Sequence, residues 1–233
     1  IRSHKAFSSQ ILAVTFTNKA AKEMQYRVSK LLRKEATGLP WLGIFHSISA
    51  KLLRKHADAV GLKSNFTIID QNDQERLIKN ICKAENVDTK KISPKYILAV
   101  IDKWKNKGLY PGDVILKKNN PLEKNFLEIY KIYQKKLTDL NATDFSDLIL
   151  HVVKIFEKYS DISELYSRKF KYILVDEYQD TNFIQSEWLK HLSQYNKNIC
   201  CVGDDDQSIY SWRGAEIKNF LTFDKIYKNC KVF

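Results

Sequence analysis

Residues 171–182 read Lys-Tyr-Ile-Leu-Val-Asp-Glu-Tyr-Gln-Asp-Thr-Asn, an apolar run that ends in two adjacent acids. The run Tyr172–Val175 is typical of a strand that is buried on both faces of a parallel α/β sheet. Ligands of such sheets bind beyond the carboxyl ends of the strands, where Asp176 and Glu177 would lie. Asp176 suits a Mg²⁺ ion that also binds phosphate oxygens, and Glu177 suits the activation of an attacking water. Taken alone, the pair also fits a solvated turn after a core strand.

The same pattern occurs elsewhere in the chain. Residues 11–17 and 41–45 are predicted strands, each followed by a predicted helix, and residues 199–202 form another apolar run. Cys200 and Cys201 lie in that last run and are expected to be small hydrophobic strand residues. Strands that alternate with helices favour a parallel sheet.

Between these α/β segments the sequence changes to successive helical patterns. Four helices are expected, over residues 72–82, 93–107, 121–137 and 144–159. Thr143 is expected to cap the last of them. The chain is therefore predicted to be an α/β domain interrupted by an all-helical subdomain. The expected limits are 1–64 for the first α/β part, 65–165 for the helical insert and 166–233 for the second α/β part.

Charge is distributed unevenly along the chain, whose formal net charge is +12. Residues 1–64 carry 12 Lys+Arg against 3 Asp+Glu, and residues 71–140 carry 15 against 9. Residues 171–233 carry 8 against 9. A basic part beside an acidic, motif-bearing part indicates a polyanionic partner such as a nucleic acid. Lysine-rich surfaces also serve solubility alone, so charge does not decide the question.

The sequence argues against a membrane protein and against a metal site built from cysteines. No uninterrupted apolar run approaches the roughly 18 residues needed to span a bilayer, and the first residues lack a signal-peptide core. The four cysteines show no metal-ligand spacing. We therefore expect a cytoplasmic protein without a membrane partner.

A second acidic stretch, residues 203–208, follows the run 199–202. Gln207 is an uncharged amide that could sense a terminal phosphate or position a water, or could simply stabilise a turn. Tyr210, Trp212 and Arg213 combine stacking surfaces with charge, which suits unpaired bases, although both aromatic residues could also belong to a core. Phe16, at the end of a predicted strand, is a further candidate, with an ordinary strand phenylalanine as the alternative.

Five stretches carry a resemblance to a known family. They read Leu-Ala-Val-Thr-Phe-Thr-Asn-Lys-Ala-Ala-Lys-Glu-Met at 12–24, Phe-His-Ser at 45–47, Thr-Asp-Phe-Ser-Asp-Leu at 143–148, Val-Asp-Glu-Tyr-Gln-Asp-Thr at 175–181, and the segment 202–215 that begins Val-Gly-Asp. In this order they resemble motifs Ia, Ib, Ic, II and III of superfamily 1 DNA helicases of the UvrD/PcrA/Rep type. The resemblance implies a RecA-like (P-loop NTPase) parallel sheet with an inserted helical subdomain.

The resemblance also implies roles for individual residues. Asp176 would hold Mg²⁺, Glu177 would activate the hydrolytic water, and Gln207 would couple the γ-phosphate of ATP to the DNA site. Contact with single-stranded DNA is implied for seven residues: Thr15, Phe16, Asn18, His46, Tyr210, Trp212 and Arg213. The implied activity is that of an ATP-dependent 3′–5′ DNA helicase acting at a junction with duplex in DNA repair or replication.

One expected motif is absent from the sequence. None of the seven glycines precedes Lys-Ser/Thr, so there is no Gly-x-x-x-x-Gly-Lys-Ser/Thr loop to cradle phosphates. We therefore expect an incomplete RecA-like sheet and a fragment of a helicase, whose remaining chain is a necessary partner. We also expect residues 1–233 alone to bind and hydrolyse ATP weakly or not at all. Three alternatives stay open: a module that only binds single-stranded DNA, part of a helicase–nuclease fusion, and a metal-dependent nuclease using Asp176, Glu177 and the acids at 204–206.

Overall fold

The computed structural model describes the whole chain except residues 2, 33–38, 90–91, 117–119 and 209–213. The chain divides into two compact units, which are considered separately below. The sheet unit comprises Ile1–Lys51 and Val153–Phe233, and the helical unit comprises Leu52–Val152. The helical unit therefore spans residues 52–152, where the sequence suggested 65–165.

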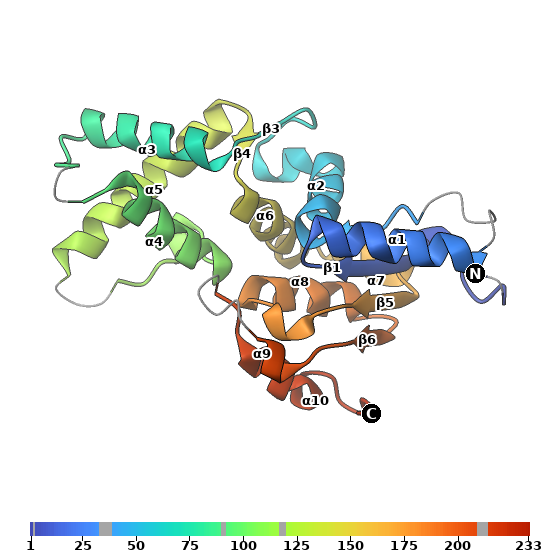
Figure 1. Cartoon of the computed structure of the whole chain (residues 1–233). Coiled ribbons are helices and arrows are strands. Elements are labelled where there is room, and N and C mark those ends of the chain that lie inside the picture. The colour runs from blue at the N-terminus through green and yellow to red at the C-terminus, as the bar shows by residue number, and fades with distance from the viewer. Residues whose placement is uncertain (2, 33–38, 90–91, 117–119, 209–213) are drawn as a thin grey trace. The chain divides into compact units, whose positions relative to one another are not determined.

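The sheet unit contains four strands and the helices between them (Figure 1). Its elements are η1 (Ser8–Gln10), β1 (Ile11–Thr15), α1 (Asn18–Leu32), β2 (Leu42–Ile44), most of α2 (Phe45–Lys55), the second part of α6 (Phe145–Lys158), α7 (Ser160–Lys169), β5 (Tyr172–Val175), η4 (Tyr178–Asp180), α8 (Phe183–Ser193), β6 (Ile199–Cys201), η5 (Asp205–Gln207), α9 (Ile217–Leu221) and α10 (Phe223–Ile226).

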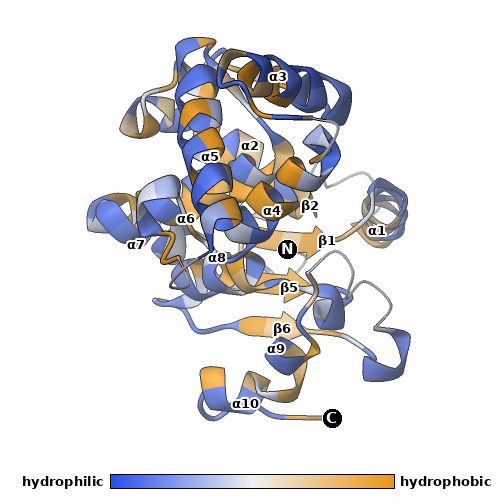
Figure 2. Ribbon diagram, turned by 90° about the vertical axis from the view of Figure 1, so that its left-hand side faces the viewer, coloured by the Kyte–Doolittle hydropathy of each residue, from blue (hydrophilic) through white to orange (hydrophobic). Residues whose placement is uncertain are grey.

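All strand pairs of this sheet are parallel, in the order β2-β1-β5-β6. Ala13 is in register with both Leu42 and Leu174, and Leu174 is in register with Cys200. Figure 2 shows β1, β5 and β6 coloured as hydrophobic. The predicted parallel α/β sheet is confirmed.

The two faces of the sheet are buried to different extents. Ile173 and Val175 on one face are each 2% exposed. On the other face α1 covers β1 and β2 through Ala21, Met24 and Val28, but Leu174 is 43% exposed. Cys200, in register with Leu174, is also exposed. The expectation that β5 is buried on both faces is therefore wrong for Leu174, and Cys200 is not a core residue, because no described element covers this part of the face.

The helical unit is built mainly from four helices and contains one very short sheet (Figure 1). Its elements are the end of α2, η2 (Ala57–Val60), β3 (Thr67–Ile68), α3 (Gln71–Ala84), α4 (Pro94–Asn106), η3 (Pro111–Asp113), α5 (Pro121–Asp139), β4 (Ala142–Thr143) and the first part of α6. The parallel pair β3–β4 adds two strands to a subdomain that the sequence predicts as all-helical. Its core is apolar and includes Ile78, Ile101 and Leu137.

Helix starts in this unit follow the cap chemistry of the sequence. The Ser93 hydroxyl accepts a hydrogen bond from the Tyr96 amide, with Pro94 at the first position of α4. At α6 the carboxylate of Asp144, rather than Thr143, accepts the bond from the Asp147 amide, at 2.8 Å. The expected cap is thus one residue too early.

None of the helices in the described part of the chain combines the length and apolar character needed to span a bilayer.

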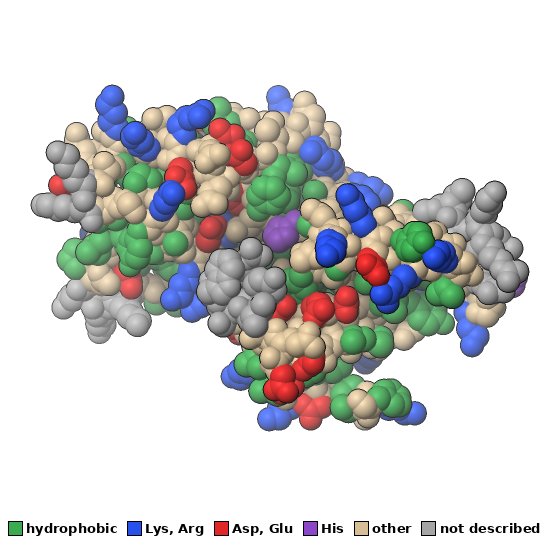
Figure 3. Space-filling view, viewed as in Figure 1, with side chains coloured by type: hydrophobic (Ala, Val, Ile, Leu, Met, Phe, Trp, Pro, Cys, Tyr) green, Lys and Arg blue, Asp and Glu red, His purple; other side chains and the backbone are tan. Residues whose placement is uncertain are grey.

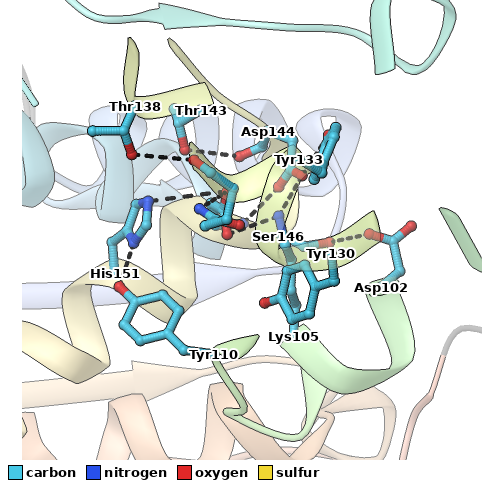
Figure 4. A network of polar contacts seen from close by, with 12 residues as sticks. Asp102, Lys105, Tyr110, Tyr130, Tyr133, Thr138, Thr143, Asp144, Ser146 and His151 are labelled. Atoms are coloured by element: carbon cyan, nitrogen blue, oxygen red, sulfur yellow. Dashed lines mark hydrogen bonds and ion pairs between the residues drawn. The ribbon is translucent and has the colours of Figure 1, made fainter. Parts of the chain in front are cut away.

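A buried ionic cluster links α4, α5 and α6 within the helical unit (Figure 4). Lys105 Nζ lies 2.6 Å from Asp144 Oδ2 and 2.9 Å from Asp147 Oδ1, and all three side chains are at most 1% exposed. The Tyr133 hydroxyl donates a further hydrogen bond to Asp144. Burial lowers the pKa of Lys105, but the two aspartates outweigh it, so this pKa is raised and the ammonium stays charged.

His151 borders the cluster. It contacts the Tyr110 hydroxyl through Nδ1, and its Nε2 lies 4.0 Å from Asp147 Oδ2. Burial lowers the pKa of His151, which keeps its ring neutral near pH 7. Lys105 is therefore the cation that compensates the two aspartates.

Lys105→Met tests this cluster. Removal of the lysine leaves two buried carboxylates without their cation, so we expect the unfolding free energy to fall by about 3–5 kcal/mol. The measurement is urea denaturation followed by circular dichroism. Lys131→Met is the matched control: Lys131 pairs with Glu128 at 2.8 Å, but the two side chains are 49% and 55% exposed. A surface pair contributes about 0–1 kcal/mol, so equal losses in the two variants would contradict the assignment.

Candidate functional site

The predicted functional residues follow four parallel strands whose carboxyl ends lie at one edge of the sheet. Thr15 ends β1, His46 is the second residue after β2, Asp176 directly follows β5, and Gln207 lies in the loop region after β6. In the view of Figure 3, acidic side chains gather over the sheet unit between α1 and α9, while lysine and arginine side chains lie along α1. The structure therefore brings the predicted acids and the described DNA-binding candidates to one edge.

Backbone hydrogen bonds fix the loop after β5. The Asp176 amide donates to Val14 O at 3.0 Å, and the Tyr178 amide donates to Val202 O at 2.9 Å. These bonds continue the strand pairing beyond the carboxyl end of β5 and attach the loop to β1 and to the residue after β6. Asp176 and Glu177 are half-buried, so both residues remain partly exposed at the carboxyl end of β5.

Glu177 has a left-handed backbone conformation, with φ 54° and ψ 42°. A residue with a side chain pays roughly 1–2 kcal/mol for this conformation. Such strain is found most often at functional sites, where the surrounding structure maintains it. The Glu177 side chain is also held, because its Oε2 accepts a hydrogen bond from Gln179 Nε2 at 2.8 Å.

The loop after β6 is tied to the loop after β5 through the same glutamine. The Asp204 amide donates to Gln179 Oε1 at 3.1 Å. Asp204 in turn accepts from Gln207 Nε2 at 2.6 Å and from the Asp206 amide at 3.1 Å. The turn-stabilising bond considered for Gln207 is therefore present, and its side chain is exposed at the sheet edge. Gln179 belongs to the motif at 175–181, but the sequence alone predicted no role for it.

The DNA-binding candidates at and after the ends of β1 and β2 have different environments. The half-buried ring of Phe16 packs on Phe45 at 5.3 Å between centroids, and Phe45 packs on Trp188 at 5.6 Å. Thr15 is fully buried, whereas Asn18 at the start of α1 is exposed. Burial lowers the pKa of His46, so a neutral ring would contact DNA through hydrogen bonding or stacking rather than charge.

Tyr210, Trp212 and Arg213 lie outside the described residues. The chain just after them is anchored to the loop that follows β5. The Glu216 amide donates to Thr181 O at 2.9 Å, and the Asn219 side-chain amide donates to the same oxygen at 3.1 Å.

The donors at this edge fit Mg²⁺ bound together with substrate phosphates. Among the residues that the structure describes, no three of histidine, cysteine, aspartate or glutamate come close enough to share a metal ion. Mg²⁺ often binds through only one or two carboxylates plus phosphate oxygens, and Asp176 supplies such a carboxylate. Asp176, Glu177 and the acids at 204–206, all among the described residues, are not grouped as three or more ligands of one metal ion, which does not support the nuclease alternative.

The parallel sheet, the acids after β5 and the inserted helical unit together define the first domain of a RecA-like helicase. A comparison with protein families agrees: residues 1–228 match the model of the UvrD/REP helicase N-terminal domain. The chain belongs to this family.

Curated relatives carry corresponding names. The chain is 46% identical over 235 residues to a probable DNA helicase II homolog of Rickettsia conorii, covering 100% of this chain and 36% of the relative. It is 45% identical over 221 residues to the ATP-dependent DNA helicase PcrA of Staphylococcus epidermidis, covering 95% of this chain and 30% of the relative. The chain thus spans about a third of the length of these relatives.

Two substitutions of Glu177 test its backbone strain. Glu177→Gly and Glu177→Ala both remove the carboxylate and its bond to Gln179, but only glycine adopts φ 54° without steric cost. We expect the glycine variant to be more stable than the alanine variant by about 1 kcal/mol in urea denaturation.

The same pair of substitutions at Glu128 in the middle of α5 is the control. There alanine should be the more stable by about 1 kcal/mol, because glycine weakens a helix interior. An alanine preference at both positions would contradict the strain at Glu177.

Proposed function

We propose that residues 1–233 are part of the first RecA-like domain, with its helical insert, of an ATP-dependent 3′–5′ DNA helicase. The whole protein would couple ATP hydrolysis to movement along single-stranded DNA and to unwinding at a duplex junction, in cytoplasmic DNA repair or replication. The main observation in support of the proposal is that the predicted ATP-site residues and the described DNA-binding candidates lie at one edge of the sheet. In a chain of the UvrD/REP family, Asp176 and Glu177 follow β5, Phe16 follows the adjacent strand β1, and His46 follows β2 on the other side of β1.

On the ATP side, Asp176 would hold Mg²⁺, which neutralises phosphate charge when bound. Glu177 would accept a proton from the attacking water, because the residue is partly exposed at the strand end and its carboxylate is oriented by Gln179. Gln207 would contact the γ-phosphate through an uncharged amide. Its bond to Asp204 orients that side chain.

On the DNA side, Phe16 would stack on a base with the support of Phe45 behind it. Asn18 and His46 would bind the same strand through neutral polar groups, and Thr15 would position Phe16 from inside the sheet edge. Three further contacts are proposed from the sequence alone, by Tyr210, Trp212 and Arg213.

Glu177→Gln in the whole protein tests the ATP side. The amide keeps the size of the side chain but cannot accept the proton, so we expect the turnover of ATP to fall by about 10²-fold or more. Binding of single-stranded DNA should change little. Steady-state ATPase assays and fluorescence anisotropy measure the two effects, and a variant with ordinary ATP turnover would refute the role of Glu177.

A second candidate function applies to residues 1–233 alone: binding of single-stranded DNA without hydrolysis. Two observations favour it, namely the net charge of +9 over residues 1–64 and the lack of a Gly-x-x-x-x-Gly-Lys-Ser/Thr loop in this sequence. If the isolated chain hydrolysed ATP and Glu177→Gln abolished that hydrolysis, the proposal that residues 1–233 alone bind DNA without hydrolysing ATP would be wrong.

Phe16→Ala tests DNA binding by the chain. Loss of one stacking ring should weaken binding of oligothymidylate by roughly 1–3 kcal/mol, about 5- to 150-fold in Kd. Binding should also weaken steeply with salt. Phe7→Ala is the control: Phe7 is 77% exposed and precedes β1, at the opposite end of the strand. Equal effects of the two substitutions, in variants with unchanged thermal unfolding, would argue against a base-stacking role of Phe16.

A further inference from the structure

Gln179 is a buried glutamine that joins two loops of the candidate site. Its side chain donates from Nε2 to Glu177 Oε2 at 2.8 Å and accepts at Oε1 from the Asp204 amide at 3.1 Å. The residue is 1% exposed. A carboxylate can only accept and a backbone amide can only donate, so the two partners fix the orientation of the glutamine amide.

The loop after β6 is shaped to admit this side chain. A Cβ atom at Gly203 would lie 2.6 Å from Gln179 Oε1 and 2.8 Å from Phe220 Cε2. Both distances are shorter than side chains tolerate, so the glycine provides space for the glutamine. The close approach of Gln179 to the loop therefore depends on two residues that are 24 positions apart.

A continuous set of hydrogen bonds runs from this loop to the candidate catalytic base. Gln207 donates to Asp204 at 2.6 Å, the Asp204 amide donates to Gln179, and Gln179 donates to Glu177. Among the described residues, the hydrogen-bond donor to the Glu177 carboxylate is the Gln179 amide. The same loop leads directly into residues 210–213, which carry the predicted base-stacking cluster.

We propose that Gln179 is a positioning residue that couples DNA binding to ATP hydrolysis by controlling the orientation of Glu177. This inference rests on the proposed helicase function. Binding of DNA would displace the loop at 203–208, and the Asp204 amide would carry Gln179 with it. The glutamine would then turn the Glu177 carboxylate toward or away from the attacking water. Gln179 itself touches neither water nor nucleotide in this scheme.

Gln179→Met in the full-length protein is the main test. Methionine keeps the length and burial of the side chain but removes both hydrogen bonds. We expect the stimulation of kcat by single-stranded oligothymidylate to fall about 10- to 100-fold, since a bond to a charged group is lost. KM for ATP and the Kd for DNA without nucleotide should stay within about threefold, because neither ligand contacts Gln179.

Two further variants separate the function of Gln179 from its contribution to stability. Gln179→Glu can still accept from the Asp204 amide but cannot, when ionised, donate to Glu177, so it should lose stimulation as well. Gln185→Met removes another buried glutamine, which forms the capping box of α8 with Asn182. This control should lower thermal stability and leave DNA stimulation unchanged.

Hydrogen exchange gives a readout that does not depend on activity. Exchange of the Asp204 amide should accelerate in Gln179→Met and remain slow in Gln179→Glu, which retains an acceptor.

The outcomes distinguish this inference from the proposed function. If the full-length wild-type protein showed no DNA-stimulated ATPase activity, both the proposed function and this inference would be wrong. Stimulation in the wild type that survives within twofold in either Gln179 variant would overturn the inference and leave the helicase function standing. If Gln179→Met does not fold, Gln179→Glu decides by the same criterion.

Discussion

The parallel pairing of β5 with both of its neighbours is the constraint on which the candidate site depends. Because β1, β5 and β6 all run in one direction, the residues that follow them must meet at one edge of the sheet. Hydrogen bonds from Asp176 to Val14 and from Tyr178 to Val202 extend this pairing into the loop. The position of the two acids is thus set by backbone geometry before any side chain contributes.

The sequence predicts this arrangement well because its signals are local. An apolar run that ends in acids predicts both a strand and the position of Asp176 and Glu177 at its carboxyl end. Burial is less predictable, since it depends on which elements cover a face. Leu174 has an apolar side chain typical of a core, yet it is 43% exposed because no described element packs over it. The left-handed backbone of Glu177 likewise has no local signal, because glutamate is not a residue that favours it.

Contacts between polar residues far apart in sequence were the least predictable. Lys105 lies 39 residues before Asp144 and is one of many lysines, so nothing in its neighbourhood marks it as buried. Gln179 lies 25 residues before Asp204, and its two hydrogen bonds exist only because the loops after β5 and β6 are adjacent in the folded sheet. A motif can contain such a residue, as it does for Gln179, but only the fold shows which partner the residue binds.

The strain at Glu177 and the hydrogen bond from Gln179 have a common physical explanation. A left-handed residue at a strand end relaxes unless its neighbours hold it, and the Tyr178 amide bond to Val202 holds the backbone on one side. The Gln179 amide holds the side chain on the other and is itself attached to the loop after β6. The conformation of the candidate base is therefore determined jointly by two loops. A change in either loop alters the balance that keeps Glu177 in place, which makes this residue a physically suitable point for one ligand site to influence the other.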